Sequence, residues 1–159
     1  MSNKILITGA PGWLGKAFLR KIFDGSASLN FSDIKILIKD KSEEESLSMF
    51  IEKDVSFSYG DLTNKKSVDL FLENSEGATL FNFAGMIHPK IFNQLDFNLI
   101  NNIGVSYLAK KSIENGLKKF VSLSSNSPNG YTKIIMSYLQ KVHLIFLIWV
   151  MENQRCKWN

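Results

Sequence analysis

The stretch TGAPGWLG, residues 8–15, separates two segments of different hydrophobic periodicity. Before it, residues 4–8 form a short apolar run that is typical of a buried strand. After it, apolar side chains recur at helical spacing from Trp13 to Ile22. The sequence therefore predicts a strand, a glycine-rich turn and a helix, and in this context such glycine spacing indicates dinucleotide binding.

The three glycines of this turn have separate expected roles. Gly9 permits the tight turn, Gly12 lets the backbone approach a pyrophosphate, and Gly15 allows the helix to pack closely on the sheet. The start of the helix adds unpaired N–H groups and the positive end of the helix dipole. The residues expected to contact the dinucleotide here are Thr8, Gly9, Gly12, Trp13, Leu14 and Gly15.

Strands and helices are expected to alternate along residues 1–130. Further strands are predicted at residues 34–38, 55–59, 79–83 and 120–124, and further helices at residues 67–73 and 91–115. This alternation predicts an α/β fold with a doubly wound parallel sheet of the Rossmann type. The expected strand order is 3-2-1-4-5.

The composition is that of one globular domain. The chain has 159 residues, 45% of them hydrophobic, and a net charge of +4 from 19 Lys and Arg against 15 Asp and Glu. The basic residues are scattered, so a nucleic-acid partner is not expected. No metal site is expected either. The longest apolar run, residues 142–151, is too short to cross a membrane. A single cysteine, Cys156, and the lack of a signal-peptide pattern predict a cytoplasmic protein.

Four further motifs follow the TGxxGxxG turn in order. They are Gly60-Asp61-Leu62-Thr63, Asn82-Phe83-Ala84-Gly85, Asn101-Asn102-Ile103-Gly104 and Val121-Ser122-Leu123-Ser124-Ser125. With these motifs, residues 4–130 resemble the extended short-chain dehydrogenase/reductase family, which includes the NAD-dependent sugar-nucleotide epimerases and dehydratases. The resemblance implies NAD or NADP as the coenzyme.

The resemblance also assigns residues to the parts of the coenzyme. Asp61 would accept a hydrogen bond from the exocyclic amine of adenine, and Leu62 would pack on the ring. The segment beside the ribose and the nicotinamide would be Phe83, Ala84 and Gly85. Asn101 and Ser124 complete the expected coenzyme contacts.

The residues after the second predicted strand bear on the choice of coenzyme. An acidic residue there bonds the ribose 2′-hydroxyl of NAD, whereas a basic residue accepts the 2′-phosphate of NADP. The chain has Lys39 and Asp40 at this place. Because Lys39 resembles the arginine of NADP-using relatives, we expect NADP.

The catalytic machinery that the resemblance implies is present only in part. Ser125 matches the serine that positions the substrate, but the tyrosine and lysine expected after it, in the pattern YxxxK, are missing. Tyr131 and Tyr138 have Ile135 and Val142 at the lysine position. Tyr107 does have Lys111, but this pair precedes the serine strand and is interpreted as a coincidence. His88 is interpreted as a loop residue near the coenzyme.

Residues 131–159 form an atypical apolar tail in place of the catalytic helix and the substrate domain. Trp149, Met151 and Trp158 have single codons, so a reading frame one base earlier places Gly, Gly and Glu there. The codons from Val142 onward then permit SPYFPYMGYGKSKMQME, whose YGKSK resembles the family's Tyr-Lys segment. The tail is therefore interpreted as a frameshift product, which resequencing of the DNA for residues 129–133 would test. Alternatively, residues 142–150 form a sixth strand beside the fifth, or a helix that packs on a partner.

Two functions follow from these patterns. The first is the NAD(P)-binding part of a sugar-nucleotide epimerase, dehydratase or reductase, inactive as this chain, with a nucleotide sugar as the substrate of the intact enzyme and a homodimer as a possible assembly. The alternative is a non-catalytic NAD(P)-binding module or redox sensor. The missing YxxxK pair favours the alternative, whereas Ser124 and Ser125 favour the enzyme.

Overall fold

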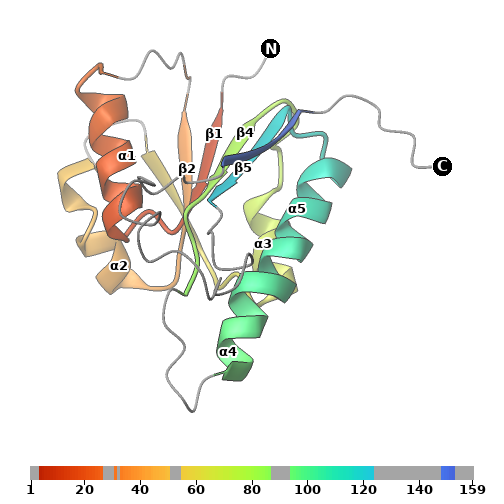
Figure 1. The fold of residues 1–159 in the computed structure, drawn as a ribbon. Coiled ribbons are helices and arrows are strands. Elements are labelled where there is room, and N and C mark those ends of the chain that lie inside the picture. The colour runs from red at the N-terminus through yellow and green to blue at the C-terminus, as the bar shows by residue number, and fades with distance from the viewer. Residues whose placement is uncertain are drawn as a thin grey trace, which may run out of the picture.

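The computed structural model describes residues 4–26, 31, 33–50, 55–86, 94–123 and 148–152. Its strands are β1 (Ile5–Thr8), β2 (Ile34–Ile38), β3 (Val55–Tyr59), β4 (Thr79–Asn82), β5 (Lys119–Leu123) and β6 (Ile148–Glu152). Its helices are α1 (Trp13–Phe23), α2 (Lys41–Glu45), the 3-10 helix η1 (Ser48–Phe50), α3 (Lys65–Phe71), α4 (Gln94–Asn98), the π-helix η2 (Leu99–Gly104) and α5 (Val105–Glu114). Helices α1 and α2 cover one face of the sheet, α3 and α5 cover the other, and α4 lies below α5 in this view (Figure 1).

The sheet has the predicted parallel core. Its strand order is β3-β2-β1-β4-β5-β6, and the first five strands are parallel, which confirms the expected order 3-2-1-4-5. Thr8 at the end of β1 lies opposite Leu37 of β2 on one side and Asn82 of β4 on the other. The chain moves outward in opposite directions from β1, so the carboxyl ends of β1 and β4 form a topological switch point, where α/β sheets bind ligands.

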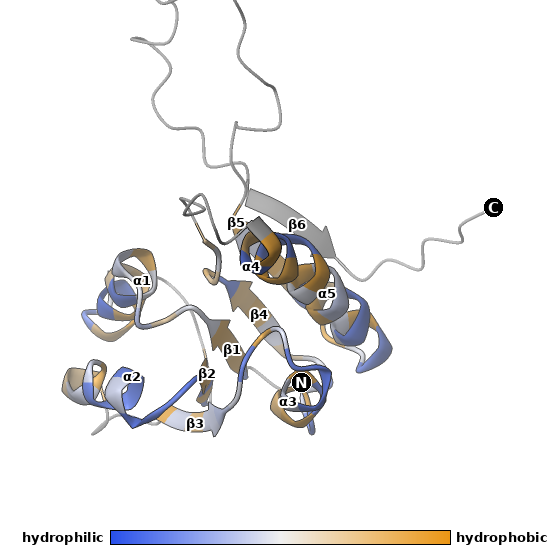
Figure 2. Ribbon diagram, turned by 90° about the horizontal axis from the view of Figure 1, so that it is seen from below, coloured by the Kyte–Doolittle hydropathy of each residue, from blue (hydrophilic) through white to orange (hydrophobic). Residues whose placement is uncertain are grey.

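Two apolar cores form because successive side chains of a strand point to opposite faces. Ile5 and Ile7 of β1 are buried with α1, whereas Leu6 between them is buried with α3 and α5. Figure 2 shows this arrangement, with apolar strands between two helical layers whose outer sides are hydrophilic. Both faces of the sheet are covered, as a parallel sheet requires.

The helices differ from the predicted ones: α3 begins and ends two residues earlier than expected, and the 3-10 helix η1 was not expected. The helix predicted over residues 91–115 is described from Gln94 to Glu114, and it contains the π-helical segment η2. The short helix α2 was not predicted, because its sequence KSEEE has no apolar periodicity. Asp40 caps this helix by accepting hydrogen bonds from the backbone N–H groups of Ser42 and Glu43.

The tail contributes one described strand. Residues 148–152 form β6, which pairs antiparallel with β5, Val150 opposite Val121. A strand beside the fifth is one of the structures expected for this tail, although residues 142–147 and 153–159 lie outside the described part of the chain. The structure does not test the frameshift interpretation.

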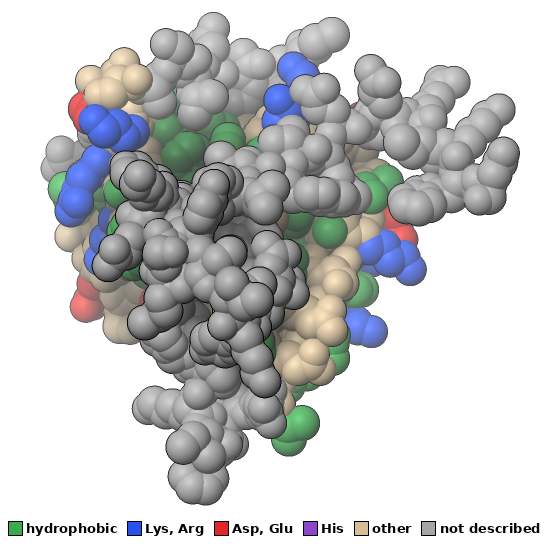
Figure 3. Space-filling view, viewed as in Figure 1, with side chains coloured by type: hydrophobic (Ala, Val, Ile, Leu, Met, Phe, Trp, Pro, Cys, Tyr) green, Lys and Arg blue, Asp and Glu red, His purple; other side chains and the backbone are tan. Residues whose placement is uncertain are grey.

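The described surface has no single basic stripe in the view of Figure 3, where the Lys and Arg side chains lie at separate places. Within the described residues, no helix is both long and apolar enough to cross a membrane.

Candidate functional site

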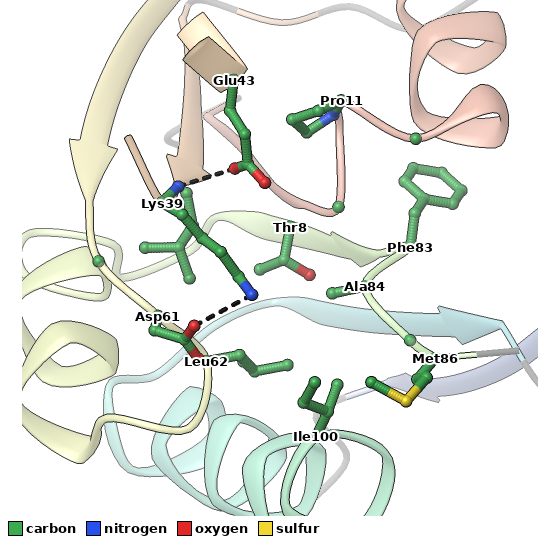
Figure 4. A pocket seen from close by; sticks show the side chains of 15 residues that line it. Thr8, Pro11, Lys39, Glu43, Asp61, Leu62, Phe83, Ala84, Met86 and Ile100 are labelled. Carbon is green, nitrogen blue, oxygen red and sulfur yellow. Dashed lines mark hydrogen bonds and ion pairs between the residues drawn. The ribbon is translucent and has the colours of Figure 1, made fainter. Parts of the chain in front are cut away.

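A cavity of about 370 Å³ opens at the carboxyl ends of β1, β2 and β4. Figure 4 shows side chains from the two sides of the switch point converging on it. Among the described residues, its lining consists of Thr8, Gly9, Pro11, Gly12, Leu37, Lys39, Glu43, Gly60, Asp61, Leu62, Phe83, Ala84, Gly85, Met86 and Ile100.

The glycine turn brings the end of β1 against the end of β4. Gly9 has a φ of 70°, which favours glycine, and a Cβ placed on it would lie 2.3 Å from the backbone nitrogen of Ala84. A Cβ on Gly15 would lie 2.5 Å from the Cα of Ala10. Among the described residues, a Cβ on Gly12 would meet only the carbonyl oxygen of Gly9, at 3.2 Å. Gly9 and Gly15 therefore serve close packing, whereas Gly12 leaves open space beside the cavity.

The first turn of α1 presents unpaired backbone N–H groups next to this space. Gly12 is the N-cap residue and provides no side-chain hydrogen bond, and the first turn contains no acidic residue. Lys16 is the first residue whose N–H bonds back into the helix, to the carbonyl of Gly12 at 2.9 Å. The Trp13 side chain is 67% exposed. The expected contribution of residues 13–15 to phosphate binding therefore lies in their backbone, not in their side chains.

Lys39 makes two interactions at the cavity. Its backbone N–H donates to Oε2 of Glu43 at 2.7 Å, and its Nζ lies 3.2 Å from Oδ2 of Asp61. Both interactions are drawn in Figure 4. Two carboxylates and one ammonium group therefore share the part of the cavity that adjoins β2.

Asp40, which was predicted to contact the coenzyme, is the N-cap residue of α2. Its Oδ1 accepts hydrogen bonds from the backbone N–H and the hydroxyl of Ser42 and from the backbone N–H of Glu43. These bonds hold the pKa of its exposed carboxyl below the usual value. Asp40 does not line the cavity, and its carboxylate caps α2.

Asp61 is held as an anion at the edge of the cavity. Burial raises the pKa of Asp61, but hydrogen bonds from the backbone and hydroxyl of Thr63 and the nearby Lys39 outweigh burial, so the pKa lies below its ordinary value. Leu62, which follows, is buried and also lines the cavity. The side chains suit the predicted adenine contacts, a hydrogen-bond acceptor beside an apolar surface.

This pKa predicts an acid-dependent stability. Because the folded state binds the Asp61 proton more weakly than the unfolded state, its stabilising effect is complete above the unfolded pKa and is lost as the pH falls through the folded pKa. We expect the difference in unfolding free energy between the wild type and Asp61→Asn to be constant from pH 7 to about pH 5 and to shrink toward pH 3. Urea unfolding at each pH measures it, and a difference independent of pH would contradict the assignment.

A buried polar chain links the carboxyl ends of three strands. Thr8 of β1 donates from its hydroxyl to Oδ1 of Asn82 on β4, and Nδ2 of Asn82 donates to Oγ of Ser122 on β5 at 2.9 Å. Thr8 and Asn82 are both almost fully buried. These hydrogen bonds tie the glycine turn after β1 to β5. This role of Asn82 was not predicted from the sequence.

Asn101 of η2 holds the loop after β4. Its Oδ1 accepts from the backbone N–H of Met86 at 2.8 Å, and its Nδ2 donates to the carbonyl of Met86 at 2.7 Å. Asn101 itself does not line the cavity, but its neighbour Ile100 does. Gly104, at the end of η2, packs on Leu62. A Cβ on Gly104 would lie 3.0 Å from the carbonyl oxygen of Leu62. The π-helical segment thus connects both sides of the cavity.

Removing the Asn101 side chain should loosen this loop. We expect Asn101→Ala to lower the unfolding free energy by about 1 to 2 kcal/mol, because two backbone groups of Met86 lose their partner. Asn102→Ala is the control, since Asn102 is exposed and bonds only to Asn98 among the described residues. Equal stability of the two variants in urea unfolding would contradict the role of Asn101.

Tyr107 and Lys111 lie away from the cavity. The Tyr107 hydroxyl donates to both oxygens of Asp69 on α3, at 3.0 and 3.1 Å. Desolvation and this carboxylate raise the pKa of Tyr107, the opposite of what a proton-transferring tyrosine needs. Neither residue lines the cavity, which agrees with the interpretation of their spacing as a coincidence.

The cavity unites many, but not all, of the predicted coenzyme residues. Those that line it are Thr8, Gly9, Gly12, Lys39, Asp61, Leu62, Phe83, Ala84 and Gly85. Trp13, Leu14, Gly15, Asp40 and Asn101 do not. Lining residues that were not predicted are Pro11, Leu37, Glu43, Gly60, Met86 and Ile100. Ser124, Ser125, His88, Tyr131 and Tyr138 lie outside the described residues.

Fold and cavity together define a nucleotide-binding α/β protein of the Rossmann class. Residues 5–139 match the model of the NAD dependent epimerase/dehydratase family. The chain belongs to this family, which confirms the resemblance seen in the motifs. Members of the family use nicotinamide dinucleotides.

One curated protein and two solved structures are similar to this chain. The uncharacterized protein y4nL of Sinorhizobium fredii (strain NBRC 101917 / NGR234) is 34% identical over 131 residues, which are 80% of this chain and 36% of that protein. The structure of Pen from Bacillus thuringiensis is 25% identical, with a TM-score of 0.69 over 80% of this chain and 38% of Pen. The UDP-Glc/GlcNAc 4-epimerase of Campylobacter jejuni is 23% identical, with a TM-score of 0.67 over 84% of this chain and 40% of the epimerase. The chain therefore spans less than half the length of each relative.

Proposed function

We propose that the cavity binds a nicotinamide dinucleotide, and that the chain is the coenzyme-binding part of a sugar-nucleotide epimerase, dehydratase or reductase. The observation that carries this proposal is the open space beside Gly12, where the uncapped first turn of α1 meets the switch point of the sheet. Backbone N–H groups at such a place favour a diphosphate, because they donate hydrogen bonds and carry the positive end of the helix dipole.

The lining fits the rest of the coenzyme. Asp61 and Leu62 would hold the adenine, and Phe83, Ala84 and Gly85 would lie along the ribose and the nicotinamide. Asn101 holds the backbone of Met86 at this end of the cavity. A Cβ on the neighbouring Gly85 would lie 3.4 Å from Oδ1 of Asn101. When bound, the nicotinamide supplies a carbon that accepts or donates hydride. The residues of this chain orient the coenzyme and shield it from water.

Turnover would need groups beyond those of the cavity. Ser125 is the proposed substrate-positioning residue, and a nucleotide sugar is the proposed substrate class, as for the Campylobacter jejuni epimerase by its name. The chain has no YxxxK pair directed at the cavity among its described residues, since Tyr107 bonds to Asp69. We therefore propose that this chain binds the coenzyme without turnover, and that YGKSK in the neighbouring frame is the source of the missing pair.

The second candidate function is a non-catalytic NAD(P)-binding module or redox sensor. It is favoured by the same missing tyrosine and lysine. The two functions differ in what a restored frame would do. An enzyme would gain turnover, whereas a sensor would bind the coenzyme equally well in both forms and gain nothing.

The test compares this chain with a frame-restored chain that carries SPYFPYMGYGKSKMQME from position 142 and continues in that frame. NADH and NADPH are titrated into both, and UDP-glucose, UDP-N-acetylglucosamine and dTDP-glucose are offered as substrates. Binding by both chains with turnover only by the restored chain supports the enzyme. Turnover by the 159-residue chain would contradict its proposed inactivity, and a restored chain that binds without turnover would favour the sensor.

A further inference from the structure

Glu43 places a carboxylate in the cavity that sequence spacing did not reveal. It belongs to the first turn of α2, is half-buried, and lines the cavity together with Lys39. Its Oε2 accepts the backbone N–H of Lys39 at 2.7 Å, which fixes the direction of the side chain. Figure 4 shows the carboxylate facing the space between Pro11 and Lys39. One hydrogen bond leaves further acceptor sites on a carboxylate, which has about four.

The one ammonium group of the described lining, that of Lys39, is paired with another carboxylate. The ammonium group of Lys39 lies 3.2 Å from Asp61, and Figure 4 shows its side chain turned toward Asp61 and away from Glu43. Asp40 caps α2 and is directed at Ser42. Within the described lining, this end of the cavity therefore carries two carboxylates, from Glu43 and Asp61, against one ammonium group.

This balance of charge distinguishes the two coenzymes. A ribose 2′-hydroxyl can donate a hydrogen bond to a carboxylate, whereas a 2′-phosphate offers only negative oxygens to it. A phosphate placed here would also have to draw Lys39 away from Asp61. Like charges in a partly dry cavity repel more strongly than in bulk water.

We infer that Glu43 selects the coenzyme, by accepting a hydrogen bond from the 2′-hydroxyl and by opposing a 2′-phosphate, so that the chain prefers NAD(H) to NADP(H). This inference rests on the proposed function, because it concerns a dinucleotide in the same cavity. It assigns the choice to the first turn of α2, in place of the end of β2, where Lys39 had led us to expect NADP.

The experiment measures the dissociation constants of NADH and NADPH by fluorescence for four forms of the 159-residue chain. They are the wild type, Glu43→Gln, Glu45→Gln and Lys39→Ala. Glutamine can still accept the N–H of Lys39, so Glu43→Gln removes the charge and keeps the local structure. Glu45 is exposed on the same helix and does not line the cavity, so Glu45→Gln is the matched control.

We expect the wild type to bind NADH at least about tenfold more tightly than NADPH, and Glu43→Gln to reduce this ratio by about tenfold, mainly through tighter NADPH binding. Glu45→Gln should leave the ratio unchanged, and Lys39→Ala should retain the preference for NADH. A wild type that prefers NADPH, or a ratio that Glu43→Gln does not alter, would overturn the inference while leaving coenzyme binding intact. A folded wild type that binds neither coenzyme would overturn the proposed function and this inference with it.

Discussion

Replacing Gly9 with alanine is expected to lower the unfolding free energy by roughly 3 kcal/mol or more. The new Cβ would lie 2.3 Å from the backbone nitrogen of Ala84 and 2.5 Å from the carbonyl carbon of Phe83. Both atoms belong to backbone, so no side chain can turn aside to relieve the overlap. The φ of 70° adds strain, because residues with a Cβ rarely adopt it. Thermal and urea unfolding measure the loss.

Gly25 provides the control for this substitution. It also has a positive φ, of 76°, but a Cβ there would meet no atom of the described residues within 4 Å. Gly25→Ala should therefore cost only the backbone strain, about 1 kcal/mol. Equal losses in the two variants would show that the contact between the turn and the end of β4 contributes nothing beyond the conformation of the glycine.

Replacing Gly12 with valine is expected to raise the dissociation constant of NADH at least about a hundredfold, while the unfolding free energy changes by no more than about 1 kcal/mol. The φ of −68° and ψ of 164° at Gly12 suit a β-branched residue. Within the part of the chain that the structure describes, the only atom within 4 Å of a Cβ at Gly12 is the carbonyl oxygen of Gly9 at 3.2 Å. The side chain would instead fill the space that a pyrophosphate needs to reach the N–H groups of α1. Fluorescence titration and urea unfolding of one preparation separate the two effects.

Gly25→Ala again serves as the control, with the opposite outcome. Gly25 lies just beyond the other end of α1. The Gly25→Ala variant should therefore lose some stability but bind NADH as the wild type does. If Gly12→Val bound NADH normally while folded, the diphosphate could not lie where we propose.

The parts of the fold that were predicted correctly depend on local patterns. The strand, turn and helix around residues 8–15 follow from glycine spacing between two different periodicities, and the strand order follows from the alternation of strands and helices. These patterns need no knowledge of which side chains meet. Asp61 and Leu62 were expected at the coenzyme only from the family resemblance, and they line the cavity because they follow the end of β3 within three residues.

Glu43 was missed although a signal for it exists. The segment Asp40-Lys41-Ser42-Glu43 has the D-x-x-E spacing of a capping box, in which the fourth residue reaches back to a backbone N–H before the helix. In the structure Glu43 reaches back one residue beyond the N-cap Asp40, to the N–H of Lys39. The charged segment lacks apolar periodicity, so the helix that carries Glu43 into the cavity was not expected. Asp40 was instead assigned to the coenzyme.

The hydrogen bonds of Asn82 and Asn101 could not be predicted from the sequence. Asn82 bonds to Thr8, 74 residues away in the chain, and Asn101 bonds to Met86, 15 residues away. Both contacts exist only because the sheet and the helix after β4 are assembled. The π-helical segment likewise depends on tertiary packing, since Gly104 must approach the backbone of Leu62.

The most direct test of coenzyme binding follows the backbone N–H groups of residues 12–15 by NMR during a titration of the folded, ¹⁵N-labelled chain with NADH. We expect the signals of Gly12, Trp13 and Leu14 to shift in a saturable manner and more than those of Asp24 and Gly25, at the other end of α1. Signals of residues 12–15 that stay in place at saturating NADH would contradict the proposal that the start of α1 receives the diphosphate.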